Sequence, residues 1–289
     1  MPDHFPSLPL PPMSGATLLR ALFKRPAPAT GAPAACGPTR YRLDRIDADQ
    51  VARYRHALGF TGAHLPLTYC YLLAQRAHLA TMLDASFPFR LAGTIHVDNA
   101  LGAGIQPAAG RALELVTGIQ VRPAAANGAV HAVLDTRASQ DGALVFSCRS
   151  TYLVVRGKRG GGQHAPHPAP ALAPLARWPL TSSSGRAYAA LSGDWNPIHL
   201  WPWSARLMGL KTPIIHGMHT QGRACAGLER AGGRPLTRLD GRFRAPIPLG
   251  GEAALSADLA AGHYTVEAGG RIAVEGHFSF DAGQAMQGA

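Results

Sequence analysis

Residues 188–199 read YAALSGDWNPIH, and residues 212–218 read TPIIHGM. The first stretch places Asp194 and His199 five positions apart on an expected loop, and the second places Gly217 at the entry of an expected helix. A carboxylate and an imidazole held near one another can share a water molecule. A glycine at a helix start can offer its N–H to an oxygen that gains negative charge. The pattern therefore predicts an enzyme active site.

Spacing alone is weak evidence for such a site, because Asp258 and His263 are also five apart, at an expected strand end and turn. The context of the first pair is richer. Asn196 is expected to orient the aspartate through its amide, and Pro197 to stiffen the turn. A polar turn with a helix cap is the structural alternative for this loop.

The expected elements occur in the same order twice. In each half, helical periodicity precedes a set of strands with alternating apolar residues. One helix followed by antiparallel strands, repeated, predicts an α+β fold in which a curved sheet wraps around a helix in each half. The expected helices cover 16–24, 51–58, 69–83, 203–209 and 214–231, and the expected strands cover 91–97, 112–121, 130–136, 143–155, 237–244, 252–259, 264–268 and 271–280.

Composition divides the chain into four regions. Residues 1–40 are rich in Pro and Ala and predict an extended arm. Residues 41–157 and 178–289 have globular patterns and predict two domains. The interval 158–177 is rich in Gly, Pro and His and predicts a linker.

Charge and cysteine usage limit the functional classes. The net charge of +11 favours anionic ligands, but the arginines are scattered, which argues against a nucleic-acid partner. No apolar stretch approaches the roughly 20 residues that a membrane span needs. Four cysteines without a C-x-x-C pattern are typical of reduced thiols and indicate a cytoplasmic protein.

These motifs resemble the signature of the MaoC-like (R)-specific enoyl-CoA hydratases, which have the hot-dog fold. The resemblance covers 180–280 and includes the segment 242–250, RFRAPIPLG. A fainter resemblance over 41–156 looks like the degenerate first half of double-hot-dog members. It rests on the LPLTY helix entry at 65–69, HVDN at 96–99 and TYL at 151–153.

The resemblance implies a hydro-lyase that adds or removes water across the 2,3 double bond of an enoyl thioester, giving an (R)-3-hydroxyacyl-CoA. It implies that Asp194 and His199 are catalytic, that the Gly217 N–H stabilises the enolate, and that His216 belongs to a structural His-Gly pair. Reading His216 with His219 as metal ligands is disfavoured because no third ligand is evident. Neither metal nor redox cofactor is expected, since the substrate is carried as a coenzyme A or acyl-carrier thioester.

Two alternatives stay open, a hot-dog acyl-CoA thioesterase and a non-catalytic acyl-thioester-binding subunit. The expected partners are the acyl-CoA substrate and a second double-hot-dog chain in a homodimer, with neither membrane nor nucleic acid. Trp195, Trp201 and Trp203 crowd the catalytic loop and suggest core packing, a narrowed acyl pocket or stacking on a ring-bearing substrate. The first half has only His64 before its central helix, so it is predicted to be catalytically inactive.

Overall fold

The computed structural model describes residues 7–25, 37–158 and 172–280. Its helices are α1 (Gly15–Phe23), α2 (Ala48–Leu58), α3 (Leu67–Leu83), α4 (Ser184–Ser192), α5 (Pro202–Leu207) and α6 (Gly217–Gly232), with a 3-10 turn η1 (Pro197–His199). Its strands are β1 (Leu8–Pro9), β2 (Thr39–Leu43), β3 (Ile95–Ala103), β4 (Leu113–Val121), β5 (Val130–Gln140), β6 (Ala143–Val155), β7 (Ala173–Leu180), β8 (Leu236–Phe243), β9 (Gly251–Asp258), β10 (His263–Ala268) and β11 (Arg271–Phe280).

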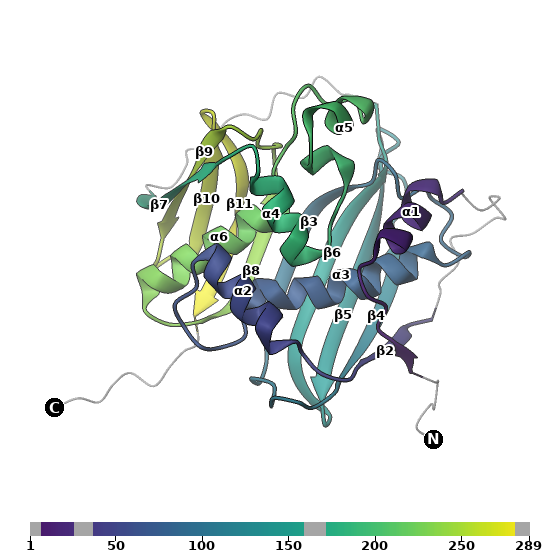
Figure 1. The fold of residues 1–289 in the computed structure, drawn as a ribbon, viewed down its shortest axis with the longest axis horizontal. Helices are drawn as coiled ribbons and strands as arrows, with labels where there is room; N and C mark the ends of the chain where they lie inside the picture. Colours follow the sequence, from purple (N-terminus) through teal and green to yellow (C-terminus); the bar gives the residue numbers. More distant parts are fainter. Residues whose placement is uncertain (1–6, 26–36, 159–171, 281–289) are drawn as a thin grey trace.

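The strands form one continuous sheet in the order β1-β2-β4-β5-β6-β3-β8-β11-β10-β9-β7. The first half contributes β1 to β6 and the second half β7 to β11. Figure 1 shows α3 lying across the strands of the first half and α6 across those of the second. A strand set wrapped around a helix, occurring twice, confirms the predicted α+β double hot-dog fold.

The two halves meet at the pairing of β3 with β8. These strands are antiparallel, and their register runs from Asp98 opposite Arg242 to Gly102 opposite Arg238. Because backbone hydrogen bonds cross this seam, the halves share one sheet rather than packing as separate bodies. Helices α3 and α6 also contact one another on the inner side of the sheet.

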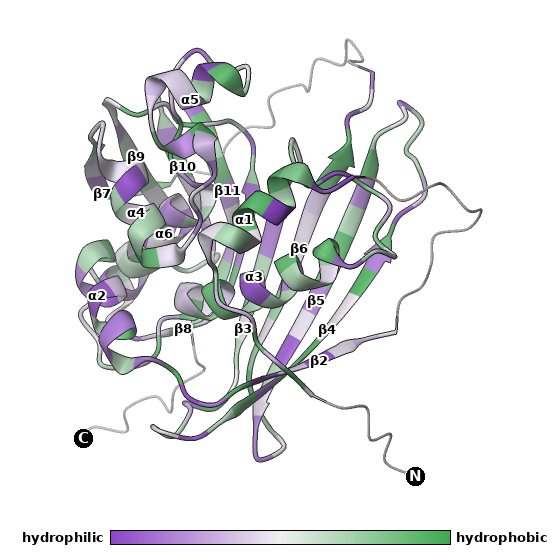
Figure 2. Ribbon diagram, turned by 45° about the vertical axis from the view of Figure 1, so that its right-hand side comes forward, coloured by the Kyte–Doolittle hydropathy of each residue, from purple (hydrophilic) through white to green (hydrophobic). Residues whose placement is uncertain are grey.

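The core lies between the sheet and the two long helices. Leu72 and Leu73 of α3 and Leu228 of α6 are among its buried side chains. Burying apolar surface contributes about 25 cal/mol per Å² and anchors each helix against the strands. Figure 2 shows the helices gathered on one side of the sheet. The core therefore fixes both helices, and with them the N-terminus of α6, which borders the predicted site.

Helix α4 lies close to the turn η1, and Gly185 permits this approach. A Cβ atom built on Gly185 would overlap the backbone carbonyl of His199. Any larger residue would therefore push α4 away from the turn that carries the predicted catalytic histidine.

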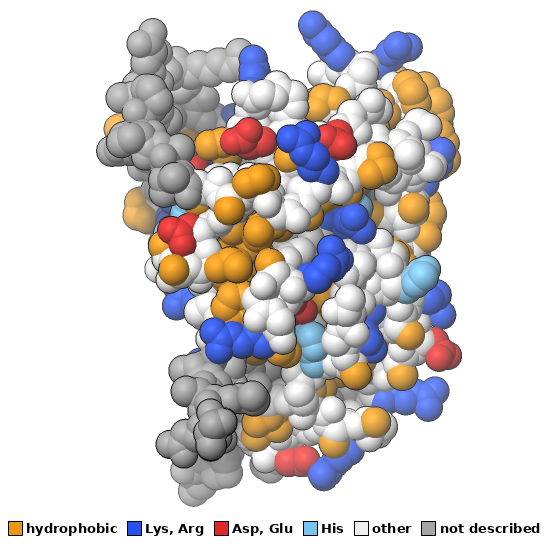
Figure 3. Space-filling model, turned by 90° about the vertical axis from the view of Figure 1, so that its left-hand side faces the viewer, with side chains coloured by type: hydrophobic (Ala, Val, Ile, Leu, Met, Phe, Trp, Pro, Cys, Tyr) orange, Lys and Arg blue, Asp and Glu red, His pale blue; other side chains and the backbone are white. Residues whose placement is uncertain are grey.

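The outer face of the sheet carries ion pairs between neighbouring strands. Arg149 contacts Asp135 at 2.6 Å, and Arg242 contacts Asp98 at 3.1 Å across the seam. Figure 3 shows one face of the molecule, on which basic side chains are interspersed with apolar and acidic ones. In the part of the chain that the structure describes, no helix has the length and hydropathy to cross a membrane.

Several predicted boundaries differ from the structure, and the largest differences are at β7 and β3. The predicted linker 158–177 overlaps β7, which begins at Ala173 and pairs with β9, while its stretch 159–171 lies outside the described residues. Pro174 and Pro179 made this segment look unlike a strand in the sequence. Prolines are tolerated there because β7 is at the edge of the sheet. The strand predicted at 91–97 begins only at Ile95.

Most of the predicted helices are present, while residues 1–6 and 26–36 of the predicted arm lie outside the described residues. The short helix predicted at 16–24 is α1, while β1 in the same arm pairs in parallel with β2 at the sheet edge. Helix α4 was not predicted from the sequence, because its Ser-, Gly- and Ala-rich residues have weak apolar periodicity.

Candidate active site

The turn η1 brings the predicted aspartate and histidine to the same place. The side-chain oxygen of Asn196 accepts the N–H of Ile198 at 3.3 Å and caps the turn. Pro197 occupies its first position, where no N–H is needed. The backbone N–H of Asn196 donates to Oδ1 of Asp194 at 3.2 Å. The loop therefore holds Asp194 against the turn that carries His199.

The imidazole of His199 is held as a neutral base. Its Nδ1 lies 2.8 Å from the carbonyl oxygen of Ile214, and because a carbonyl can only accept, Nδ1 carries the proton. Burial holds the pKa of His199 below its ordinary 6.5, although Asp194 and the Ile214 carbonyl act in the opposite direction. At neutral pH the ring therefore keeps an unprotonated Nε2.

His216 supports both partners. Its ring stacks on that of His199 with centroids 3.6 Å apart and an interplanar angle of 27°. Its Nε2 donates to the backbone carbonyl of Asp194 at 2.9 Å. Burial lowers the pKa of His216 to about 3, so this ring is also neutral. The predicted structural role of His216 thus has a physical basis in these two contacts.

Asp194 is half-buried and ionised at neutral pH. Burial alone would raise its pKa, but two imidazoles and two N–H donors outweigh burial and hold the pKa of Asp194 below its ordinary 3.8. The four groups are His216, His199, the backbone of Asn196 and the side chain of Gln75. The site therefore presents a carboxylate and a neutral imidazole side by side.

The entry of α6 follows directly after His216. The first N–H groups of a helix have no partner within it, and the Gly217 N–H has no acceptor among the described residues. The positive end of the helix lies behind this N–H. A Cβ on Gly217 would come within 2.8 Å of the Phe243 ring, so a glycine is needed for the close packing here.

The same cluster could be considered as a metal site. Three potential ligand atoms lie within 4.8 Å of one another, one each from Asp194, His199 and His216. His219 is outside this group. Metal ligands direct their lone pairs to a common point. Two rings stacked at 3.6 Å cannot do so readily, and one nitrogen of each ring already binds a backbone carbonyl. The geometry favours proton transfer.

The structure corrects one predicted detail and excludes one of three alternatives left open for the tryptophans. The side-chain amide of Asn196 caps the turn, and it is the backbone N–H of this residue that contacts the aspartate. The three tryptophans are not core residues: Trp195 is 41%, Trp201 38% and Trp203 62% exposed. Trp201 and Trp203 stack on one another with centroids 6.0 Å apart.

Sequence reasoning missed one residue that reaches the site. Gln75, on α3 of the first half, donates from Nε2 to Oδ2 of Asp194 at 3.4 Å. The two residues are 119 positions apart, so no local motif joins them. Helix α3 also carries Arg76 and His78, so a polar residue at position 75 gave no specific signal in the sequence.

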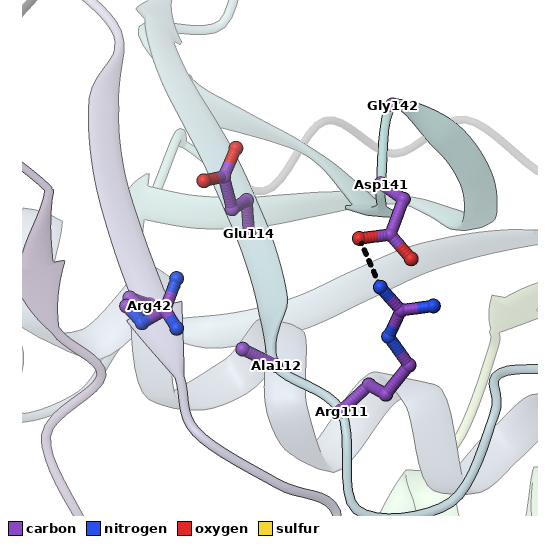
Figure 4. A pocket seen from close by; sticks show the side chains of 6 residues that line it. All are labelled: Arg42, Arg111, Ala112, Glu114, Asp141 and Gly142. Atoms are coloured by element: carbon purple, nitrogen blue, oxygen red, sulfur yellow. Dashed lines mark hydrogen bonds and ion pairs between the residues drawn. The ribbon is translucent and has the colours of Figure 1, made fainter.

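Other candidate positions have ordinary structural roles. His64 pairs with Glu229 at 3.1 Å, far along the chain from the catalytic loop. Asp258 and His263 face one another at the end of the β9–β10 pair. A surface pocket in the first half is lined by Arg42, Glu114 and the Arg111–Asp141 ion pair (Figure 4). These charged side chains are largely exposed, unlike the dyad.

Comparison with known proteins identifies a family for this chain. The MaoC like domain family matches residues 169–263. 3-Hydroxyacyl-thioester dehydratase X of Mycobacterium tuberculosis is 31% identical over 219 residues, covering 73% of this chain and 76% of that protein. 3-Hydroxyacyl-thioester dehydratase Y of the same organism is 38% identical over 119 residues, covering 37% of this chain and 41% of that protein.

Solved structures show the same architecture. The crystal structure of HtdX from M. tuberculosis gives a TM-score of 0.67 at 26% identity and covers 83% of this chain and 99% of that one. A conserved hypothetical M. tuberculosis protein with a double hot-dog fold gives 0.54 at 14% identity, covering 84% and 95%, which is a likeness of fold alone. The sequence and structural matches extend over both halves, and the chain belongs to the MaoC-like dehydratase family.

Proposed function

We propose that the protein is a hydro-lyase that interconverts a trans-2-enoyl thioester and an (R)-3-hydroxyacyl thioester. The observation that carries this proposal is the ionised Asp194 beside the neutral, Nδ1-protonated His199, next to the free N–H of Gly217. The relative of 31% identity is a 3-hydroxyacyl-thioester dehydratase, which supports the same reaction here. The (R) configuration follows the family resemblance.

The protonation states of the dyad suggest how it divides the work. Water bound between Asp194 and His199 gives one proton to the imidazole Nε2 as its oxygen attacks the β-carbon. The electron pair of the double bond moves onto the thioester oxygen as an enolate. The same Nε2 then returns the proton to the α-carbon, so that both parts of the water add to one face of the double bond. Asp194 stays ionised, orients the water and stabilises the imidazolium.

The enolate oxygen needs a hydrogen-bond donor that is already in place. The Gly217 N–H, at the positive end of α6, supplies it without the reorganisation that solvent would require. In enzymes where it has been tested, removing one such donor by mutation lowers kcat roughly 10²–10³-fold. Every chemical step in this scheme uses groups of the protein, and neither a metal nor a redox cofactor takes part.

Carrier, assembly and location are further parts of the proposal. We expect a coenzyme A or acyl-carrier thioester as substrate and a homodimer of double-hot-dog chains. A cytoplasmic location is supported by the thiols of Cys70, Cys148 and Cys225, which are buried and form no disulfide within the described residues.

Hydration of crotonyl-CoA tests the function. Loss of the absorbance of the conjugated enoyl thioester, with chiral analysis of the product, measures the reaction. The wild type is expected to form (R)-3-hydroxybutyryl-CoA, and Asp194→Asn to lose about 10²–10⁴-fold in kcat. Release of free coenzyme A would indicate a thioesterase instead. Binding without turnover of a series of enoyl-CoA esters would indicate a non-catalytic subunit.

A further inference from the structure

The catalytic carboxylate is held by one donor from each half of the molecule. The backbone N–H of Asn196 donates to Oδ1 of Asp194 at 3.2 Å, within the catalytic loop. Gln75 donates to Oδ2 at 3.4 Å from α3, in the half that lacks its own D-x4-H sequence. Two donors on two oxygens fix both the position and the rotation of a carboxylate, which a single donor cannot do.

The placement of Gln75 follows from α3. Tyr71 precedes it by four residues and His78 follows it by three, so these polar side chains lie on one helix face. Tyr71 and His78 both contact Tyr152 of β6, and these contacts fix this face of the helix against the sheet. Gln75 lies between them and reaches the second half.

The orientation of the Gln75 amide follows from chemistry. An ionised carboxylate only accepts hydrogen bonds, so the NH2 group of Gln75 must face Asp194. Its Oε1 then points away from Asp194, buried, and has no partner among the described residues. A buried acceptor without a donor is costly. A water molecule or a hydroxyl of the substrate would satisfy it, and this atom is next to the carboxylate that acts on water.

The ionisable neighbours of Asp194 are uncharged at neutral pH, so its carboxylate has no ion-pair partner among them and hydrogen bonds contribute to holding it ionised. Burial raises the pKa of each neighbouring tyrosine and lowers the pKa of each neighbouring histidine, so none carries charge at neutral pH. The neighbours that interact electrostatically with it are His199, His216, Tyr188 of α4, Tyr71 of α3, His96 of β3 and Tyr152 of β6. The imidazoles of His216 and His199, together with the N–H donors of Asn196 and Gln75, hold the pKa of this carboxylate low.

We propose that Gln75 is a positioning residue for the reaction. It donates to Asp194, keeps the carboxylate turned toward the water that His199 deprotonates, and makes the first half part of the active site. This inference rests on the hydro-lyase function proposed above, and it adds a requirement that the catalytic loop alone does not predict.

Two substitutions at Gln75 test the proposal. Gln75→Leu removes the donor and is expected to lower kcat about tenfold or more at every pH, with KM little changed. Gln75→Glu is nearly isosteric. Two carboxylates this close cannot both ionise easily. The carboxyl group that Gln75→Glu introduces therefore keeps its proton over the lower part of the pH range and can still donate a hydrogen bond to Asp194. Its rate relative to wild type should be high while that proton is retained and should fall as pH rises.

The measurement is kcat and KM for crotonyl-CoA from pH 5 to 9, with thermal denaturation of each variant to confirm folding. Gln50→Leu is the matched control. Gln50 also donates across the halves, to the carbonyl of Leu191 at 3.0 Å, but it does not contact Asp194. It is expected to keep the wild-type pH profile and kcat, even if its stability falls.

The outcomes separate this inference from the function itself. A Gln75→Leu variant with wild-type kcat, or a Gln75→Glu variant whose rate ratio to wild type is constant with pH, would overturn the positioning role while leaving the hydro-lyase function intact. If Asp194→Asn keeps full activity, the function and its site assignment fail first, whatever the Gln75 variants do.

Discussion

The entries of the two central helices have nearly the same backbone and very different chemistry. Pro66, before α3, has φ −61° and ψ 135°, and His216, before α6, has φ −61° and ψ 136°. At α6 the entry faces Asp194 and His199. At α3 the nearby polar group is His64, which pairs with Glu229 of the other half. The backbone of the entry belongs to the fold, whereas catalysis depends on the side chains placed around it.

Each helix also sends a polar side chain to the opposite half. Gln75 of α3 reaches Asp194, and Glu229 of α6 reaches His64 and the backbone N–H of Leu236, both at 3.1 Å. The first contact holds a reactive carboxylate. The second gives a buried carboxyl group, 7% exposed, two hydrogen-bond partners. Each half therefore sends one polar side chain to the other, but only the side chain of Gln75 reaches a predicted catalytic residue.

The largest expected difference is between substitution of His199, near the entry of α6, and substitution of His64, near the entry of α3. His199→Gln removes the base that accepts the proton of water, and kcat should fall about 10²–10⁴-fold. His64→Gln alters the corresponding region of the first half and should leave kcat unchanged. Steady-state hydration of crotonyl-CoA checks both variants. A comparable loss in the two would mean that the first half takes part in the chemistry.

Gly217→Ala tests the crowded entry of α6. The added methyl would press on the Phe243 ring and displace the N–H from the enolate oxygen, and misplacement of this kind can cost about 10²-fold in kcat/KM. Gly15→Ala is the control, because Gly15 also begins a helix but a Cβ there meets nothing within 4 Å. Equal activity of the two variants would contradict the role given to the α6 entry.

Lowering the pH should reduce both the activity of the site in the second half and the stability of the whole molecule. Protonation of His199 removes the base, so kcat/KM should fall about tenfold per pH unit below a pKa that is itself below 6.5. The folded pKa values of His78 and His216, both about 3, are lower than in the unfolded chain. The unfolded state therefore binds more protons below pH 6.5, and the free energy of unfolding should fall as pH decreases from there.

Thermal denaturation at pH 7 and pH 5 checks the sign of this effect. Since His78 lies in the first half and His216 in the second, the whole molecule should be less stable at pH 5. A higher denaturation midpoint at pH 5 than at pH 7 would show that these rings are charged in the folded protein.

The smallest expected effect concerns Glu229. Glu229→Gln keeps the shape of the side chain but removes the charge that accepts from His64 and Leu236, at an expected cost of about 1–3 kcal/mol in the free energy of unfolding. The hydration rate should stay the same. Urea denaturation beside the crotonyl-CoA assay separates the two quantities, and a loss of rate without a loss of stability would place Glu229 in the reaction.

Local patterns in the sequence predicted most of the fold and the catalytic loop. Strand β6 was predicted with its observed bounds, because its alternating residues report directly on a half-buried strand. Asp194 and His199 were predicted together because they are five positions apart in one short loop, and the structure brings one side-chain atom of each within 4.8 Å of the other. Gln75 was not found, since its partner lies in the other half and only the folded sheet brings them together. Strand β7 was missed because prolines mask an edge strand.

The seam between β3 and β8 limits how a substrate can reach the dyad. Opening a cleft by swinging one half away from the other would break the backbone hydrogen bonds that run from Asp98–Arg242 to Gly102–Arg238. A hinge of that kind is too costly for a step repeated in every turnover. The two halves are therefore expected to stay joined through turnover, so that the contact between Gln75 and Asp194 across them is kept.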